Sequence, residues 1–386
     1  MDWLAQALGL PECFLSGGST HGGGVIHGSA SEAILTNMVA AREKYLAAVT
    51  AHLPDDTDEK EEALWEFRSK LVAVGSSGTH SSTKKAAQIL GVRFATVPVF
   101  EEDGFSMTRV ALETTISDLR ALGLHPFYIT TTLGSTDIWV HVDAAYAGTA
   151  LLLDENKHLA KTFSSFHSFS FNPHKWMLTT FDCSAVWVRR RAWFIQALSI
   201  KPPYLRNQFS DDELVTDYRD WQIPLGRRFR SLKLWFVLRS FGVKGLQAHV
   251  RHGIELGESL QAKIESRPDL FTVFTKARFG LVTLRVNGST EEEINERTEA
   301  VYEKINADGE FFLTATVINR KFAIRVCTGV AKVEEEHVQR VFEVLVEQAE
   351  SRVLKKPVTN GAVDVQIANK TETPLVNGAK AQATKA

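Results

Sequence analysis

Asn172-Pro173-His174-Lys175-Trp176 is the stretch from which the fold can be predicted, because Lys175 lies 32 positions after Asp143 in His141-Val-Asp-Ala-Ala-Tyr-Ala-Gly148. Pyridoxal phosphate chemistry requires a lysine that forms a Schiff base and a carboxylate that keeps the pyridine nitrogen protonated. The apolar run from Ile138 to Val142 predicts a buried strand, so Asp143 should lie at its carboxyl end, where open α/β sheets bind ligands. An ordinary exposed lysine is the alternative for Lys175 alone. Together the two stretches predict a pyridoxal 5'-phosphate site with Lys175 and Asp143 as catalytic residues.

Longer strings resemble a known family. They are His141 to Gly148, Phe171-Asn-Pro-His-Lys-Trp176, Phe181-Asp-Cys-Ser184 and Thr216-Asp-Tyr-Arg-Asp-Trp-Gln-Ile-Pro-Leu-Gly-Arg-Arg-Phe-Arg-Ser-Leu-Lys233. These strings resemble the aromatic L-amino acid decarboxylase family, group II of the pyridoxal phosphate-dependent decarboxylases. The resemblance extends from Met1 to about residue 350 and is more specific than a single glycine motif.

The resemblance implies an α/β fold of the aspartate aminotransferase-like kind (fold type I). We expect a large cofactor-binding domain over residues 1–258 and a small α+β domain over residues 259–355. The C-terminal strands and helices are predicted at 280–286, 291–307, 312–316, 321–328 and 333–354, after a long helix over 232–266 interrupted near Gly242 and Gly245. Residues 356–386 lack sustained periodicity, which predicts a disordered tail.

Composition narrows the class of ligand. The 386 residues include 44 Lys and Arg against 46 Asp and Glu, a formal charge of −2, so no overall field attracts nucleic acid or an anionic membrane. Cys13, Cys183 and Cys327 are widely separated, which disfavours a disulfide framework and a metal site. An acidic second residue and the lack of a long apolar run argue against a signal peptide and a membrane span. We expect a soluble cytoplasmic enzyme for a small amino acid substrate.

Two loops that precede helices are candidates for cofactor contacts. The glycine-rich segment 22–31 predicts a loop that leads into a helix from Glu32 to about Thr50, whose amino end favours an anion. A simple turn is the alternative. The resemblance implies that Ser29, Ala30 and Ser31 hold the cofactor phosphate. It also implies that His80, which follows a predicted strand over Leu71–Val74, stacks on the cofactor ring as a catalytic residue, although an ordinary surface histidine is the alternative.

Further cofactor contacts follow from the resemblance. It implies contacts from Ser135, where the family usually has threonine, and from Ala145, Asn172, His174 and Arg219. A simple turn is the alternative for Asn172-Pro173, and a surface salt bridge is the alternative for Arg219.

Two residues bear on the product and the substrate. Tyr204 matches the mobile-loop tyrosine to which the family assigns protonation of the substrate Cα, whereas relatives with phenylalanine there tend to form aldehydes. Gly226 matches a position where glycine accompanies indole substrates among plant relatives. The resemblance therefore favours conversion of tryptophan to tryptamine, with tyrosine or dopa as further substrates.

The chain departs from the family pattern in two places. Relatives carry a helical segment before the point where this chain begins, so the apolar helix containing Trp3, Leu4, Leu8 and Leu10 is expected to lack its cover. Only Gly134 to Asp137 connect two predicted strands that are parallel in the family. A link that short predicts a hairpin, a local rearrangement or a sequence missing an exon, because a parallel crossover needs about a dozen residues.

These departures leave two alternative functions open beside an aromatic amino acid decarboxylase. One is a catalytically impaired cofactor-binding protein that pairs with a longer relative, or an incomplete gene product. The other is a decarboxylase of an acidic amino acid. By resemblance we expect a homodimer.

Overall fold

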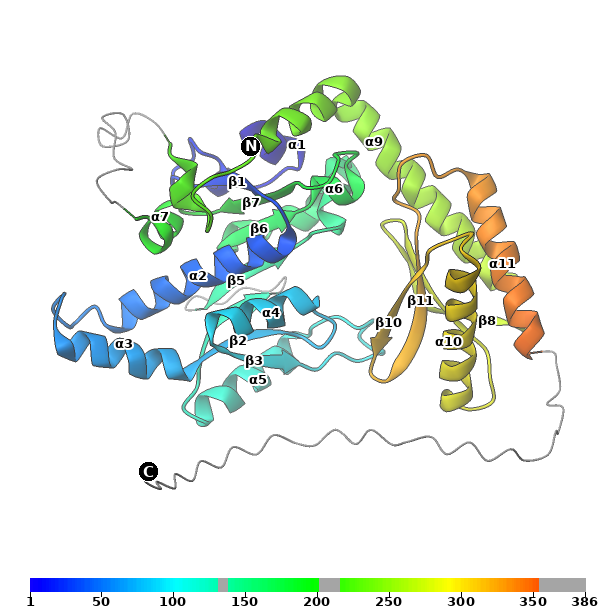
Figure 1. Ribbon diagram of the computed structural model, residues 1–386, viewed down its shortest axis with the longest axis horizontal. Coiled ribbons are helices and arrows are strands. Elements are labelled where there is room, and N and C mark those ends of the chain that lie inside the picture. The colour runs from blue at the N-terminus through cyan, green and yellow to red at the C-terminus, as the bar shows by residue number, and fades with distance from the viewer. Residues whose placement is uncertain (131–137, 201–215, 354–386) are drawn as a thin grey trace, which may run out of the picture.

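The computed structural model describes residues 1–130, 138–200 and 216–353, which form a seven-stranded and a four-stranded sheet (Figure 1). The larger sheet has the order β1-β7-β6-β5-β4-β2-β3. Only β7 runs antiparallel to its neighbours; all other pairs are parallel. The strands are β1 (Gly23–His27), β2 (Leu71–Ser76), β3 (Arg93–Val97), β4 (His125–Thr130), β5 (Trp139–Asp143), β6 (Ser168–Phe171) and β7 (Ser184–Val188).

Apolar side chains cover both faces of this sheet, as expected for a largely parallel sheet. Successive residues of a strand point to opposite faces. In β7, Ala185 and Trp187 join one core cluster and Val186 and Val188 join the other. The helices of this part are α1 (Asp2–Ala7), α2 (Ala30–Val49), α3 (Asp58–Lys70), α4 (Ser81–Leu90), α5 (Arg109–Ala121), α6 (Pro173–Trp176) and α7 (Ala192–Leu198). Short 3-10 helices are η1 (Glu12–Phe14), η2 (Ala147–Leu152), η3 (Asp154–Ala160), η4 (Phe163–Ser165) and η6 (Tyr218–Trp221).

A long helix connects the two sheets. Figure 1 shows α9 (Arg230–Glu265) running from the larger sheet to the smaller one, where it lies beside α11. It is kinked at Gly242, whose φ of 61° and ψ of 177° are not helical. Leu256, Leu260 and Ile264, spaced by one turn, pack into the core of the smaller sheet.

The C-terminal unit, residues 271–353, is built on the order β10-β11-β9-β8. All its strand pairs are antiparallel. Its elements are β8 (Phe271–Arg278), β9 (Leu281–Val286), α10 (Glu291–Asp308), β10 (Thr314–Ile318), β11 (Lys321–Cys327) and α11 (Glu335–Val353). The expected small α+β arrangement is present, with β8 as an additional strand. The boundary at residue 258 falls inside α9 and stays a prediction, and the tail lies outside the described residues.

The glycine-rich segment is not simply a loop, because Gly23–His27 form the fully buried strand β1. Glycine is required for this packing. A Cβ on Gly24 would lie 2.7 Å from Nε1 of Trp187 on the neighbouring strand. The alternation that normally reveals a strand is hidden by the three glycines, and the helix that follows begins at Ala30 rather than Glu32.

The expectation of an uncovered N-terminal helix is wrong for three of its four apolar residues. Leu4, Leu8 and Leu10 are 1%, 0% and 7% exposed and share a core cluster with Trp187. Trp3 alone matches the expectation, at 75% exposed.

Of the alternatives that the short link between β4 and β5 left open, the hairpin is wrong. Tyr128, Ile129 and Thr130 lie opposite Trp139, Val140 and His141 in parallel register. Burial of both strands on both faces favours this pairing. Residues 131–137 of the connection lie outside the described residues.

Candidate active site

The predicted site residues follow strands that end at one edge of the larger sheet. Both β1 and β6 pair antiparallel with β7, and Ala185 lies opposite Ile26 and Phe171, so the ends of β1 and β6 are level. Since β5 and β2 run parallel to β6, the segments after β1, β2, β5 and β6 emerge at the same edge. This is where open α/β sheets bind ligands.

Backbone hydrogen bonds hold the segments after β5 and β6 together. The amide of Asn172 donates to the carbonyl of Ala145 (2.9 Å), and the amide of Lys175 donates to the carbonyl of Asn172 (2.9 Å). The amide of Ala145 also donates to Oδ1 of Asp143 (3.1 Å). The fold therefore brings together four of the predicted residues, Asp143, Ala145, Asn172 and Lys175.

The surroundings of Lys175 favour a nucleophilic amine. Burial lowers the pKa of Lys175, the negative charge of Asp143 opposes this shift, and the positive charge of Arg325 adds to it; the net pKa is below its ordinary value. A larger fraction of the amine is therefore neutral near neutral pH.

Asn172 and His174 are held by residues around the start of β7. Asn172 is 1% exposed and its Oδ1 accepts a hydrogen bond from Oγ of Ser184 (2.7 Å). The amide of Cys183 donates to Nδ1 of His174 (2.9 Å), and burial lowers the pKa of His174. The neutral ring therefore carries its proton on Nε2, where it can donate to an anionic oxygen.

The start of α2 combines a helix amino end with a carboxylate. Oγ of Ser29 accepts from the amide of Glu32 (3.2 Å) and caps the helix. Burial opposes ionisation of Glu32, but its contact with His27 holds the pKa of Glu32 below its ordinary value, and Oε2 accepts from the amide of Gly28 (2.9 Å). An anion must therefore use the amides of Ala30 and Ser31, since Glu32 already occupies that of Gly28.

His80 follows β2 at the same edge of the larger sheet, and it also caps a helix. It caps α4, because its Nδ1 accepts from the amide of Ser82 (3.2 Å). Its side chain is exposed, and stacking on a cofactor ring stays a prediction.

Arg219 lies in η6 and Gly226 follows it, and the predicted roles of both stay predictions. Nε of Arg219 lies 3.0 Å from Oδ2 of Asp217 and 3.8 Å from Oδ1 of Asp220. Its element, η6, meets the start of β1, where a Cβ on Gly23 would lie 2.7 Å from the ring of Trp221. Gly226 is exposed, and a Cβ there would meet no atom within 4 Å. Ser135 and Tyr204 lie outside the described residues.

Two residues that we did not predict also belong to this site. Arg325 lies on β11 of the C-terminal unit, and its positive charge lowers the pKa of Lys175. Its signal in the sequence is an arginine inside the otherwise apolar strand Phe322-Ala-Ile-Arg-Val326. His141 is fully buried beneath Asp143, with Nδ1 2.8 Å from Oγ of Ser168 and Nε2 3.1 Å from Oγ of Ser170.

The residues present fit pyridoxal phosphate. A lysine with a lowered pKa, an adjacent carboxylate, a histidine Nε2 donor and a capped helix start match the aldehyde, the pyridine nitrogen and the phosphate. No cluster of three metal-ligating side chains occurs in the part of the chain that the structure describes. Nor is any helix in residues 1–130, 138–200 or 216–353 long and apolar enough to cross a membrane.

Comparison with known proteins agrees with this geometry. Residues 1–287 match the pyridoxal-dependent decarboxylase conserved domain. The chain belongs to the pyridoxal-dependent decarboxylase family. It is 41% identical to mouse (Mus musculus) aromatic-L-amino-acid decarboxylase, over 91% of this chain and 74% of the relative. It is 38% identical to tryptophan decarboxylase 2 of Oryza sativa subsp. japonica, over 93% and 73%.

Solved structures of this family confirm the predicted fold. The crystal structure of Oryza sativa TDC with PLP and tryptamine superposes with a TM-score of 0.82 and 32% identity, covering 91% of this chain and 74% of that one. The α/β prediction of fold type I and the predicted family are therefore confirmed, and the pyridoxal cofactor is that of the family. The individual site residues stay predictions.

Proposed function

We propose that this protein is a pyridoxal phosphate-dependent carboxy-lyase that converts aromatic L-amino acids to amines, with tryptophan favoured over tyrosine or dopa. The observation that carries the proposal is Lys175, whose pKa is lowered and whose segment is hydrogen-bonded at the sheet edge to the segment that follows Asp143. The identity to a mouse enzyme named for aromatic amino acids supports the substrate class.

When bound, pyridoxal phosphate supplies an aldehyde that condenses with amines and a conjugated ring that accepts an electron pair from the substrate Cα. Lys175 provides the amine that holds it. Asp143 would keep a proton on the pyridine nitrogen, and His174, whose Nδ1 accepts from the amide of Cys183, would offer Nε2–H to the phosphate. Ser29, Ala30 and Ser31 bind that phosphate at the start of α2.

Arg325 and Tyr204 complete the assignment on the substrate side. Arg325 provides a guanidinium that can hold the α-carboxylate of an amino acid before carbon dioxide leaves. Tyr204 supplies the proton that Cα needs for release of an amine, an assignment that rests on the family resemblance.

The choice of tryptophan rests on two supports. Gly226 is the residue that accompanies indole substrates by resemblance. The rice relative is named tryptophan decarboxylase 2, and the rice structure was determined with tryptamine. The names of these relatives favour aromatic over acidic substrates.

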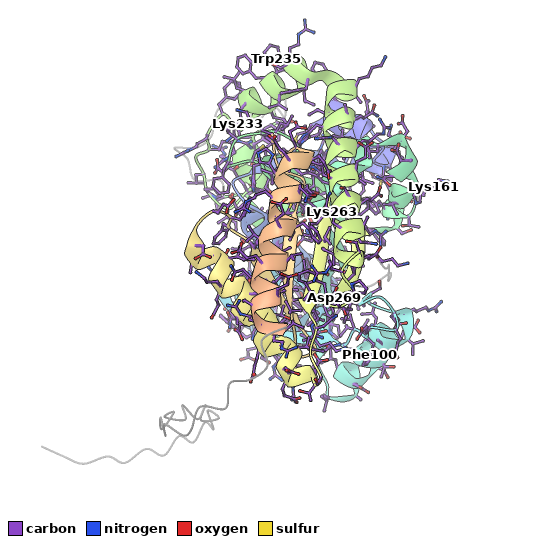
Figure 2. The ribbon with its side chains drawn as sticks, turned by 90° about the vertical axis from the view of Figure 1, so that its right-hand side faces the viewer. Phe100, Lys161, Lys233, Trp235, Lys263 and Asp269 are labelled. Atoms are coloured by element: carbon purple, nitrogen blue, oxygen red, sulfur yellow. The ribbon has the colours of Figure 1, made fainter. Side chains whose placement is uncertain are left out.

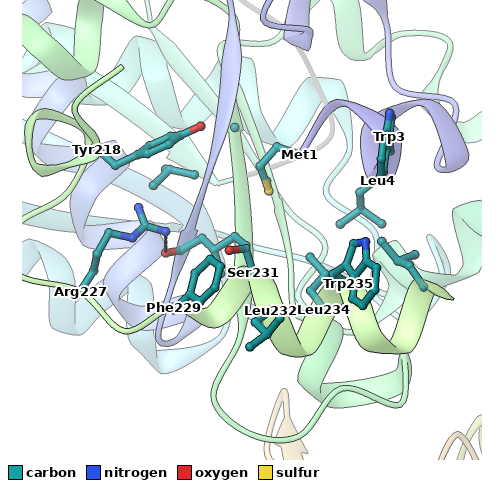
Figure 3. Close-up of a pocket in the computed structure, with 14 residues that line it drawn as sticks. Met1, Trp3, Leu4, Tyr218, Arg227, Phe229, Ser231, Leu232, Leu234 and Trp235 are labelled. Atoms are coloured by element: carbon teal, nitrogen blue, oxygen red, sulfur yellow. Dashed lines mark hydrogen bonds between the residues drawn. The ribbon is translucent and has the colours of Figure 1, made fainter. Parts of the chain in front are cut away.

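We also infer a cytoplasmic homodimer. Trp3, Phe229, Leu232, Trp235 and Phe236 are exposed near the meeting point of α1 and α9. With Leu4 and Leu234 they surround or adjoin an open cavity of about 530 Å³ between α1, β1 and α9 (Figure 3). An apolar surface of this kind typically binds a protein, and a second copy is the partner implied by the family resemblance. Three free cysteines suit a reducing compartment.

Absorbance and mass spectrometry of variants test the cofactor assignment. Lys175→Ala should lose the visible absorbance of lysine-bound cofactor and all tryptamine production. Lys161→Ala is the matched control, because Lys161 is exposed (Figure 2) and should leave both unchanged. Normal cofactor absorbance in Lys175→Ala would contradict the proposal, whereas bound cofactor without any amine from the wild type would favour the impaired alternative.

A further inference from the structure

Tyr146 joins the two sequence motifs of the site. It lies three residues after Asp143, and its ring stacks on Trp176 with centroids 5.0 Å apart and planes inclined by 5°. Trp176 is fully buried and directly follows Lys175. A single aromatic contact therefore links the segment after β5 to the lysine-bearing helix α6.

The hydroxyl of Tyr146 reaches the C-terminal unit. Oη donates to the carbonyl of Phe279, between β8 and β9, at 2.9 Å. Sγ of Cys327, at the end of β11, lies 3.3 Å from the same Oη. A carbonyl can only accept, and burial raises the pKa of Tyr146 so that it keeps its proton; the thiol must therefore be the donor in the second bond.

The end of β11 packs tightly around the Tyr146 hydroxyl. A Cβ on Gly329 would lie 2.4 Å from Oη of Tyr146 and 2.7 Å from Nε1 of Trp176. Oγ1 of Thr328 donates to the carbonyl of Gly253 in α9 (2.7 Å), and the amide of Thr328 donates to the carbonyl of Gly280 (2.8 Å). The end of β11 is thus held between α9, the β8–β9 turn and Tyr146.

Arg325 lies on the same strand as Cys327, two residues earlier and therefore on the same face. The residues between and before them, Val326 and Ile324, face the core of the C-terminal unit. The bond between Tyr146 and Cys327 therefore fixes the end of the strand that carries Arg325, on the same face as Arg325.

We propose that Tyr146 is a positioning residue whose hydroxyl holds the end of β11, and with it Arg325, beside the helix that carries Lys175. Its effect on turnover rests on the proposed function, through the role of Arg325 toward the substrate carboxylate. Its effect on the position of β11 does not.

Tyr146→Phe is the direct test, because it keeps the ring stack and removes both hydroxyl bonds. The matched control is Asn319→Ala, which breaks a distant contact of the C-terminal unit, Nδ2 of Asn319 to the carbonyl of Val99 (2.9 Å). Cys327→Ala should give a weaker form of the Tyr146→Phe effect. Cys327→Ser should keep wild-type behaviour, because serine still supplies a hydrogen-bond donor to Tyr146.

Two of the measurements need no turnover. In full-length protein, Tyr146→Phe should speed amide hydrogen exchange over residues 325–329 about fivefold or more. It should also slow capture of pyridoxal phosphate by the apoprotein, followed by absorbance, about threefold at neutral pH, because displacement of Arg325 away from Lys175 raises the pKa of Lys175. With tryptophan as substrate, KM should rise about tenfold while kcat changes less than about twofold.

Asn319→Ala should leave all three quantities at their wild-type values. Wild-type exchange and capture rates in Tyr146→Phe would overturn the proposal, as would equal changes in Asn319→Ala. A loaded wild-type protein that produces no amine would overturn the proposed function but not the placement of β11, since amide exchange over residues 325–329 does not depend on catalysis.

Discussion

The pKa of Lys175 depends on three parts of the chain, namely its own helix α6, Asp143 of β5 and Arg325 of β11. The first two could be predicted from the sequence, because they stand in recognisable strings with a chemical reason for their types. Arg325 could not, since it lies 150 positions away in a strand whose only unusual feature is one charge. Tyr146 was visible in the motif, but its partners Phe279 and Cys327 emerge only from the packing of the C-terminal unit.

His141 should make the fold sensitive to acid. Burial lowers the pKa of His141 from 6.5 to about 4. Between these values the unfolded chain binds more protons, so stability falls as pH decreases from 6.5 to 4 and this group adds nothing further below 4. The loss amounts to about 3 kcal/mol.

Urea unfolding at pH 7 and pH 4 measures this loss. His141→Gln should reduce the difference between the two unfolding free energies by about 3 kcal/mol, whatever its effect at pH 7. His158→Gln, at an exposed position, should not reduce it. Equal pH dependence in wild type and His141→Gln would show that His141 does not control the acid response.

Gly226 should influence substrate choice without affecting stability. A Cβ there meets nothing within 4 Å, so Gly226→Ser should fold normally. We expect the ratio of kcat/KM for tryptophan to that for tyrosine to fall about tenfold, a change typical of one altered contact. An unchanged ratio in competition assays would remove Gly226 from the specificity residues.

At the scale of elements, the sequence predicted helices better than strands. The helix predicted over 291–307 occurs at Glu291–Asp308, where acidic residues in the first turn and an apolar stripe agree. The strand β1 was missed because glycines hide its periodicity, and a hairpin of β4 and β5 was left open because the link between them is short. The strand β1 and the parallel pairing of β4 with β5 are both determined by neighbouring strands in the sheet, and those neighbours cannot be identified from the local sequence.

The cap of α2 allows stability to be separated from cofactor binding. Ser29 and Thr290 cap α2 and α10 in the same way, each accepting from an amide three residues later at 3.2 Å. Replacing either by alanine should cost about 1 kcal/mol in the free energy of unfolding. Only Ser29→Ala should also weaken binding of pyridoxal phosphate, by about tenfold, since it removes a predicted phosphate contact at the helix start. Equal cofactor affinity of the two variants, measured by absorbance titration, would exclude a contact between the phosphate and the Ser29 hydroxyl.

At the scale of the whole molecule, α9 carries an apolar surface at the end remote from the C-terminal unit. Trp235 lies at that end in Figure 2, far from Asp269, and is 46% exposed. If a second copy covers it, Trp235→Glu should weaken dimerisation at least about tenfold, because burying an unpaired charge is unfavourable. Phe312→Glu is the control, since Phe312 is 84% exposed on the C-terminal unit. Sedimentation of the wild type as a monomer, or of Trp235→Glu as an unchanged dimer, would exclude this surface as the dimer interface.

The most direct test of the whole account is to supply the protein and pyridoxal phosphate with tryptophan, tyrosine, dopa and glutamate in separate reactions. Carbon dioxide and amine are then quantified by mass spectrometry. We predict stoichiometric tryptamine and carbon dioxide from tryptophan, less amine from tyrosine and dopa, and none from glutamate. Amine from glutamate alone, or none from any substrate while the cofactor is bound, would contradict the assignment as an aromatic amino acid decarboxylase.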